Sequence, residues 1–227
     1  KMHADFYLNS LYPLQDRVLK SIEKTNKHFY LTGGTAVSRV YLHHRFSDDL
    51  DLFVNRLPTF QQEVLEIYEQ LVSNFDNVEK SLFDESFVRL YVVENGIRLK
   101  IELINDVGYH FNGFTETSIF NRIDNWQNIL SNKITALSRQ EGKDCADIIF
   151  IALSYPFVWS EIIEQANLKD MWVNALLAAE SLSVFPEAKL RLVNWITEPD
   201  YKQLMEYCQL ISRDILFGEA NSLYQPK

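Results

Sequence analysis

The order of predicted strands and helices limits which folds this 227-residue chain can adopt. Runs rich in β-forming residues occur at 28–31, 50–54, 78–83, 87–93 and 97–104, and amphipathic helices are predicted at 10–27, at 35–44 and from Pro58 onward. The segment 105–118 is expected to be a loop, and the later pattern is almost purely helical, at 122–140, 143–154, 158–168, 171–181, 187–197 and 200–216. We therefore expect an α/β domain at residues 1–118 and a helical domain at 119–227 that completes its site.

Glu94, Asn95 and Gly96 separate the last two β-forming runs and have the composition of a tight hairpin turn. Strands joined by such a turn pair antiparallel. The run at 78–83 lies just before them in the chain, so we expect these three strands to form an antiparallel extension of the sheet.

Glycine is scarce in this chain, yet two glycines are adjacent. The seven glycines are about half of the number that the average usage of roughly 7% would give. Gly33 and Gly34 join a predicted strand to a predicted helix, where unobstructed backbone N–H groups can bind phosphate oxygens. A simple turn explains a Gly-Gly pair as well, so both interpretations stay open at this point.

Asp49 and Asp51 lie at the start of the predicted strand 50–54. Residues two apart in a strand project from the same face, so these carboxylates repel each other unless a cation lies between them. Mg²⁺ prefers carboxylate oxygens together with substrate phosphates. Leu50, Leu52 and Phe53 are expected to point into the core and hold the strand. The alternative is an acidic turn that faces solvent.

Glu102 offers a third carboxylate on a neighbouring strand. Strict alternation places it on a polar face with Lys100 and Arg98. A two-metal site for phosphoryl transfer uses a further carboxylate to hold the metal and to accept a proton from the nucleophile. Glu102 is therefore a candidate metal ligand and base, and an ordinary solvated strand face is the alternative.

Two blocks of sequence resemble the nucleotidyltransferases of the AbiEii/AbiGii toxin family, within the DNA polymerase β-like superfamily. The first block consists of FYLTGGTAV at 29–37 and RFSDDLDLF at 45–53. The second consists of NILSNKITAL at 128–137, Arg139, and GKDCADI at 142–148. The wider superfamily pattern is Gly-Gly or Gly-Ser, then two acidic residues separated by one, then a later strand carboxylate.

The resemblance implies an α+β fold, with a nucleotidyltransferase-type mixed β-sheet flanked by helices and followed by an α-helical C-terminal part. It implies an enzyme that uses Mg²⁺ or Mn²⁺ to transfer NMP from an NTP to an acceptor hydroxyl, with release of pyrophosphate. The acceptor would be an RNA such as tRNA, or a protein. The enzyme would be the toxin of a toxin–antitoxin or phage-defence system, with a cognate antitoxin protein as partner.

The resemblance also implies roles for individual residues. Lys133 would neutralise developing charge on the triphosphate, although a solvated helix lysine is the ordinary interpretation. The expected metal ligands are Asp49, Asp51 and Glu102, which with Lys133 are also the expected catalytic residues. The expected nucleotide-binding residues are Gly33, Gly34, Thr35, Arg45, Ser47, Lys133 and Asp147.

Two other functions remain as alternatives: a nucleotidyltransferase for a small molecule of the antibiotic type, and a non-catalytic nucleotide-binding protein. The formal net charge of −9 argues against broad, non-specific nucleic-acid binding, because that affinity comes from lysine and arginine at phosphates. Arg39, His43 and His44 are the candidates for a small local basic surface.

The remaining composition favours a cytoplasmic protein without a membrane span. The longest apolar stretch, 148–159, is interrupted and shorter than the roughly 20 residues that a span needs, and no signal peptide is expected. Cys145 and Cys208 are interpreted as buried thiols. The four tryptophans are interpreted as packing residues: Trp126, Trp159, Trp172 and Trp195.

Overall fold

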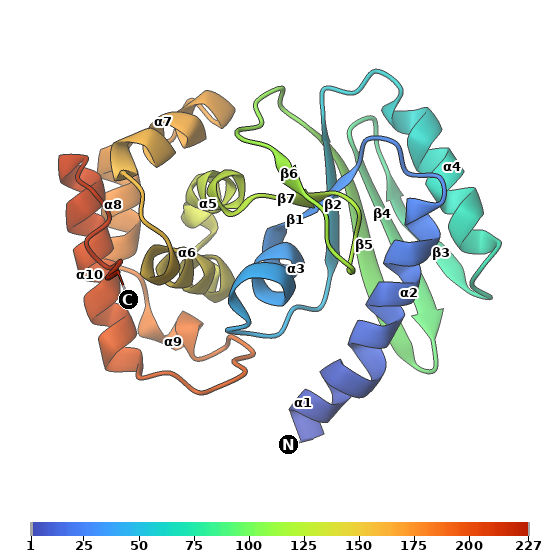
Figure 1. Cartoon of the computed structure of the whole chain (residues 1–227), viewed down its shortest axis with the longest axis horizontal. Coiled ribbons are helices and arrows are strands. Elements are labelled where there is room, and N and C mark those ends of the chain that lie inside the picture. Colours follow the sequence, from blue (N-terminus) through green and yellow to red (C-terminus); the bar gives the residue numbers. More distant parts are fainter. Residues whose placement is uncertain (1, 227) are drawn as a thin grey trace. The chain divides into compact units, whose positions relative to one another are not determined.

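A computed structural model describes residues 2–226, which form two compact units (Figure 1). The first unit contains the described residues up to Ala36, together with Phe46–Gly108 and Gly113–Asn125. The second contains Val37–Arg45, Tyr109–Asn112 and the described residues from Trp126 onward. The domain boundary expected after residue 118 stays a prediction.

The first unit is built on a mixed sheet of seven strands in the order β3-β4-β5-β2-β1-β7-β6. β2 pairs parallel with β5, β1 pairs parallel with β7, and the other neighbours pair antiparallel. The strands are β1 Tyr30–Thr32, β2 Leu50–Asn55, β3 Val78–Phe83, β4 Phe87–Glu94, β5 Ile97–Asp106, β6 Phe114–Thr115 and β7 Ile123–Asp124. The helices are α1 Met2–Phe6, the π-helical η1 Tyr7–Leu11, α2 Tyr12–Glu23, α3 Gly33–Ala36 and α4 Phe60–Val72. The predicted α+β class with a mixed sheet is confirmed.

One face of this sheet is apolar and is covered by α2 and α4 (Figure 1). Leu31, Leu52 and Leu103 are in register on neighbouring strands, and all three are fully buried. Because side chains alternate along a strand, Thr32, Asp51 and Glu102 lie in register on the opposite face. The apolar core thus fixes which face receives the carboxylates.

The antiparallel extension β3-β4-β5 agrees with the sequence prediction. Asn95 and Gly96 have φ values of 50° and 79°, which suit a tight hairpin of the type that favours Asn-Gly. Phe53 does not join Leu50 and Leu52 in the core as expected. It lies one residue out of phase with them and is only half-buried, because the side-chain period of a strand is two.

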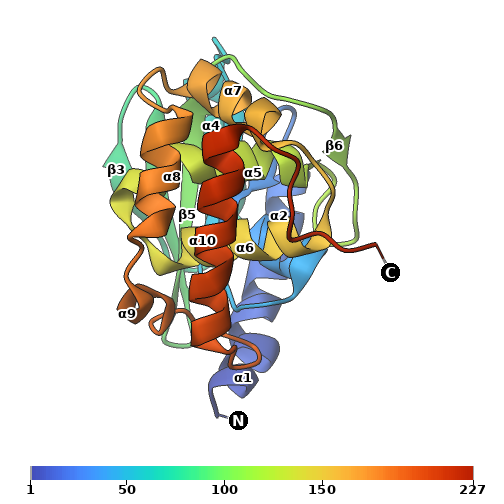
Figure 2. The same ribbon diagram turned by 90° about the vertical axis from the view of Figure 1, so that its left-hand side faces the viewer.

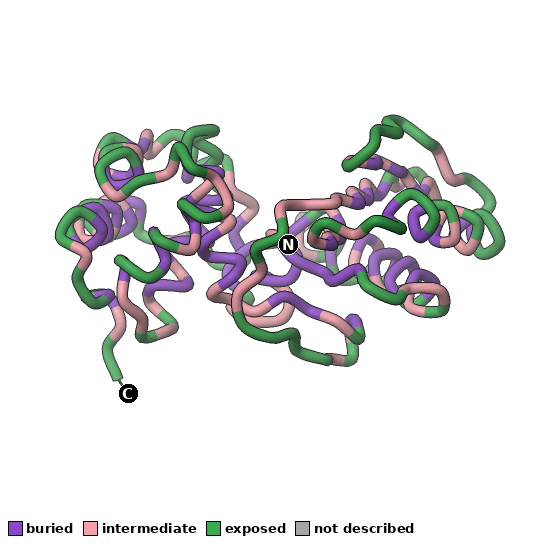
Figure 3. The backbone as a smooth tube through the Cα atoms, turned by 90° about the horizontal axis from the view of Figure 1, so that it is seen from above, coloured by how far each residue is buried: buried purple, intermediate pink, exposed green. Residues whose placement is uncertain are grey.

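The second unit is helical. Its elements are the π-helical η2 Val37–Leu42, α5 Trp126–Thr135, the 3₁₀ helix η3 Leu137–Arg139, α6 Gly142–Ser154, α7 Trp159–Lys169, α8 Ala175–Ser183, α9 Glu187–Leu190 and α10 Tyr201–Phe217. α8 and α10 pack side by side (Figure 2), and buried and exposed stretches alternate along the helices (Figure 3). Trp159 is fully buried. Cys145 and Cys208 are buried free thiols, as predicted, with their Sγ atoms 3.6 Å apart.

Several predicted boundaries were wrong. The loop expected at 105–118 contains β6, and the helix expected from 122 begins only after β7. The helix expected at 187–197 ends at Leu190, because Trp195 forms a β-bridge with Arg45 and its indole Nε1 donates to the Leu190 carbonyl oxygen at 3.0 Å. Trp172 is 80% exposed and does not pack in the core.

No helix within residues 2–226 has both the length and the apolar character that a membrane crossing requires.

Leu52→Ala tests the apolar face that orients β2. Leu52 is fully buried, so the truncation is expected to lower the free energy of unfolding by about 2–5 kcal/mol. Leu65→Ala is the matched control, because Leu65 lies on α4 and is 46% exposed. Its effect should stay within about 0.5 kcal/mol. Urea unfolding measures both, and equal effects would contradict the placement of Leu52.

Candidate active site

Three carboxylates share the face of the sheet opposite to α2 and α4. Asp51 lies on β2 and is in register with Glu102 on β5, while Asp49 directly precedes β2, two residues before Asp51. The intervening Leu50 is fully buried, which fixes the alternation. The structure therefore places the three residues that the sequence predicted as metal ligands on one face of the sheet.

Two cationic side chains lie among these carboxylates. Lys100 Nζ is 2.8 Å from Asp49 Oδ2 and 3.5 Å from Glu102 Oε1. Arg89 on β4 is in register with Glu102, and its Nη2 is 2.7 Å from Glu102 Oε1. Burial alone would lower the pKa of Lys100, but the hydrogen bond to Asp49 and the charges of the three carboxylates together raise it. The like charges on this face are thus partly neutralised by the protein itself.

Gly33 makes room for Asp51. Gly33 has φ +65°, a backbone conformation that residues with a side chain rarely adopt. A Cβ atom at this position would also collide with Asp51 Oδ2. Gly34 is the next residue of the same short helix, α3. The glycine pair is therefore more than a simple turn, because the carboxylate approaches the Gly33 backbone closely.

Thr35 and Ser47 connect the Gly-Gly turn to the segment before β2. Thr35 Oγ1 is 2.9 Å from Ser47 Oγ and 2.5 Å from the carbonyl oxygen of Asp49, and both side chains are buried. Their hydroxyl groups fix the backbone that leads to Asp49.

Three side chains from the N-terminal region, none of them predicted from the sequence, hold the same segment. Gln15 Nε2 donates to the carbonyl oxygens of Ser47 and Asp48, at 3.1 and 3.0 Å. Tyr12 accepts a hydrogen bond from the Ser47 N–H, and Tyr7 donates to Asp48 Oδ1. Gln15 is fully buried on the apolar side of α2. A polar residue inside an apolar stripe is the sequence signal that could have identified it.

The chemistry of the donor set fits a hard divalent cation, since Mg²⁺ prefers carboxylate oxygens. Within the described residues, no three His, Cys, Asp or Glu side chains converge closely enough to hold a metal ion in this arrangement. Asp49 and Glu102 are paired with Lys100 and Arg89 instead.

The other predicted residues, Arg45, Lys133 and Asp147, form a buried ion network in the second unit. Arg45 donates to both oxygens of Asp147, from Nε and Nη2, at 2.7 Å each. Lys133 Nζ lies 2.8 Å from Asp147 Oδ2 and 2.6 Å from Asp144 Oδ1. Lys133 is thus a buried residue with two carboxylate partners, unlike a solvated helix lysine.

Asp147 remains ionised in this network. Burial alone would raise its pKa, but the charges of Arg45 and Lys133 and the hydrogen bonds from His44 and Arg45 hold the pKa well below its usual value. His44 was expected on an exposed basic surface, and this was wrong. It is buried, and its Nε2 is 2.9 Å from Asp147 Oδ1.

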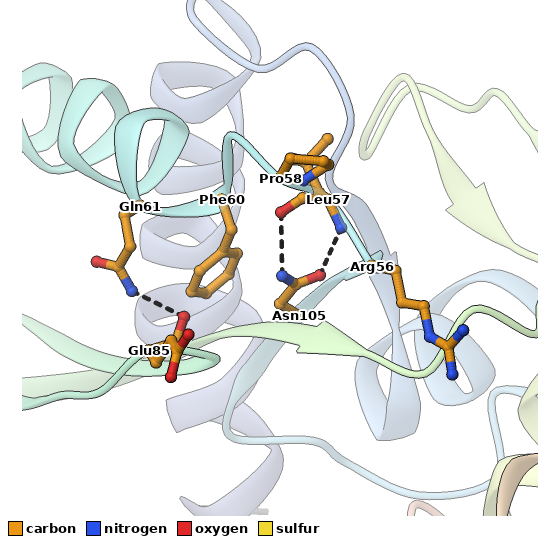
Figure 4. A pocket seen from close by; sticks show the side chains of 7 residues that line it. All are labelled: Arg56, Leu57, Pro58, Phe60, Gln61, Glu85 and Asn105. Atoms are coloured by element: carbon orange, nitrogen blue, oxygen red, sulfur yellow. Dashed lines mark hydrogen bonds between the residues drawn. The ribbon is translucent and has the colours of Figure 1, made fainter.

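A pocket of about 370 Å³ opens at another place in the first unit (Figure 4). It lies next to the carboxyl ends of β2 and β5, where Asn105 bonds to the backbone N–H and carbonyl oxygen of Leu57. Its lining consists of Arg56, Leu57, Pro58, Phe60, Gln61, Glu85 and Asn105. None of the predicted site residues is among them.

Comparisons with known proteins show the family and the fold. The family model described as nucleotidyl transferase AbiEii toxin, type IV toxin–antitoxin system, matches residues 17–214. No curated protein sequence matches the chain.

Two solved structures share the fold. A protein of H. pylori assigned as a nucleotidyltransferase is 18% identical, with 92% of this chain and 96% of that chain covered at a TM-score of 0.62. The protein JHP933 of Helicobacter pylori is 19% identical, with 92% and 93% covered at a TM-score of 0.59. At these identities the likeness establishes the fold alone.

Gly33→Ala tests the close approach of Asp51. Gly96→Ala is the matched control, because Gly96 also has a positive φ but nothing lies within 4 Å of an added Cβ. Both variants should lose about 1–2 kcal/mol of unfolding free energy through backbone strain. Gly33→Ala should lose about a further 1–3 kcal/mol, because the added methyl group must displace Asp51. Urea unfolding measures the difference, and equal losses would refute the contact.

His44→Gln tests the buried network through its pH dependence. Burial lowers the pKa of His44, although Asp147 acts in the opposite direction. The ordinary pKa of this side chain is 6.5. At pH values below it, the unfolded chain therefore binds a proton that the folded chain does not, and the free energy of unfolding falls as pH falls. His44→Gln should flatten this decline by up to about 1.4 kcal/mol per pH unit.

The measurement is urea unfolding at several pH values between 7 and 5. His43→Gln is the matched control, since His43 is adjacent and exposed, and it should keep the slope of the unmodified protein. A slope that His44→Gln leaves unchanged would contradict a neutral buried His44.

Proposed function

Since the chain belongs to the AbiEii family of nucleotidyltransferase toxins, we propose that it transfers NMP from an NTP to an acceptor hydroxyl and releases pyrophosphate. The observation that carries this proposal is the carboxylate face of the first unit, where Asp49, Asp51 and Glu102 project together beside the Gly-Gly turn. Carboxylates on adjacent strands are the ligands that metal-assisted phosphoryl transfer uses.

We assign Asp49 and Asp51 as the residues that would hold Mg²⁺ or Mn²⁺, with Glu102 as the third carboxylate. A divalent cation bound there would supply charge neutralisation at the nucleotide phosphates. Two backbone N–H groups and two hydroxyl side chains complete the proposed site. The N–H groups of Gly33 and Gly34 would bind phosphate oxygens, and Thr35 and Ser47 would hold the loop that positions Asp49.

The reaction is a displacement at the α-phosphorus. The acceptor oxygen forms a bond to this phosphorus, and the bond from the phosphorus to the pyrophosphate oxygen breaks. The proton of the acceptor hydroxyl passes to a base, for which Glu102 is our candidate because it lies beside Asp51. Positioning and electrostatics supply most of the catalysis in such transfers.

Nucleotide binding by Arg45, Lys133 and Asp147 stays a prediction. Their ion pairs support a positioning role, because Asp147 clamps the guanidinium of Arg45 with two hydrogen bonds. Arg45 is the second residue before Ser47 in the chain. A fixed Arg45 therefore anchors one end of the segment that leads to the carboxylates.

The family description supports the proposed partner. The family description names a type IV toxin–antitoxin system, which supports a toxin with a cognate antitoxin. We propose an RNA such as tRNA, or a protein, as acceptor, and the cytoplasm as the place of reaction.

Label transfer from NTPs labelled at the α-phosphate tests the proposal. Asp49→Ala and Asp51→Ala are each expected to lower transfer to total RNA or protein at least about 100-fold, because each removes a ligand of the metal that neutralises the phosphates. Asp48→Asn is the matched control, since Asp48 is adjacent and exposed and the amide keeps the oxygen that accepts from Tyr7, and it should transfer label normally.

The labelled product distinguishes the candidate functions. Label in RNA or protein supports the proposed acceptors, whereas label only in a small molecule identifies the antibiotic-type alternative. NTP binding without any transfer would show a non-catalytic nucleotide-binding protein. Transfer that survives both alanine substitutions would refute the assigned site.

A further inference from the structure

We propose that Lys100 is a tethered cation of the carboxylate face: its ammonium neutralises Asp49 and Glu102 until a divalent cation binds, and it then contacts the phosphates of the nucleotide. This inference rests on the proposed function and adds to it a residue that lies in neither of the two blocks that resemble the family.

The pairing of β2 with β5 places Lys100 beside Asp49. Leu50 is in register with Ile101, so the residues that precede them, Asp49 and Lys100, project from the same face of the sheet. The ammonium lies 2.8 Å from Asp49 Oδ2 and 3.5 Å from Glu102 Oε1. Lys100 therefore interacts with the same carboxylates that the proposed metal needs.

A metal ion and this ammonium compete for the same oxygen. Metal bound to Asp49 Oδ2 would place two cations within a few ångströms, and they would repel each other. Lys100 can withdraw, because lysine has a flexible stem and its side chain is 27% exposed. Glu102 keeps a counter-charge when Lys100 leaves, since Arg89 holds it at 2.7 Å.

Lys133, the other lysine assigned to the site, is held more tightly than Lys100. Its side chain is 9% exposed, and its ammonium lies within 2.8 Å of two carboxylates. Lys100 is therefore the one of these two lysines whose ammonium can exchange partners without uncovering a buried charge. The negative triphosphate that accompanies the metal is the partner that its released ammonium fits.

Direct Mn²⁺ binding without nucleotide, followed by electron paramagnetic resonance, tests the inference. Lys100→Met is expected to bind Mn²⁺ about tenfold more tightly, because the competing charge is gone. With Mn²⁺ present, the same variant should bind a non-hydrolysable NTP analogue about tenfold more weakly. Lys100→Arg keeps the charge and should resemble the unmodified protein in Mn²⁺ binding.

Arg98→Met is the matched control. Arg98 lies two residues before Lys100 on the same strand and the same face, but it pairs with Glu79 at 2.8 Å. It should leave both affinities unchanged. Urea unfolding of each variant confirms that the protein is folded before binding is measured.

The outcomes separate this inference from the proposed function. If Asp49→Asn weakens Mn²⁺ binding but Lys100→Met does not strengthen it, the metal site stands and the role of Lys100 is refuted. If Lys100→Met binds Mn²⁺ more tightly yet binds the analogue normally, the phosphate contact is refuted. Absence of Mn²⁺ binding in every variant would refute the inference and the metal site together.

Discussion

Repulsion between like charges is the constraint on which the carboxylate face depends. The parallel pairing of β2 with β5 sets Asp51 beside Glu102, and alternation adds Asp49 to the same face. Such a face is stable only with compensating cations nearby. Lys100 and Arg89 supply them from the neighbouring strands. These two cations therefore allow three carboxylates to lie on one face of the sheet without a bound metal.

The second unit also contains clustered charges, and there the charged groups are buried. Removing one partner from a buried ion pair costs about 3–5 kcal/mol, so the partners depend on each other. Asp147 accepts from Arg45, Lys133 and His44, and Asp144 shares the ammonium of Lys133. The Asp-x-x-Asp spacing places both carboxylates on one side of α6. Asp147, which was predicted to bind nucleotide, therefore has a structural role in this unit.

Local patterns predicted most of the fold, and long-range contacts account for the rest. Alternation and turn composition suffice for β3, β4 and β5, because each strand carries its own period and its own hairpin signal. β6 and β7 have two residues each, too few to show a period, and they exist only because they pair with each other and with β1. The end of α9 depends on the bridge between Trp195 and Arg45, which no local pattern encodes. In the candidate site, residue spacing along each strand predicted that the carboxylates project from one face. The pairing of Lys100 with Asp49 could not be predicted in this way, because it depends on the register between β2 and β5.

The buried thiols of Cys145 and Cys208 can be used to measure local opening of the second unit. The hydrogen bond to Cys208 and burial raise the pKa of the Cys145 thiol, so the enclosed thiol carries little of the reactive thiolate. Both residues are fully buried, so a reagent reaches either sulfur only when the structure around α6 and α10 opens. The alkylation rate of the native protein therefore measures how often this region opens, and amide exchange in the same helices would distinguish local opening from global unfolding.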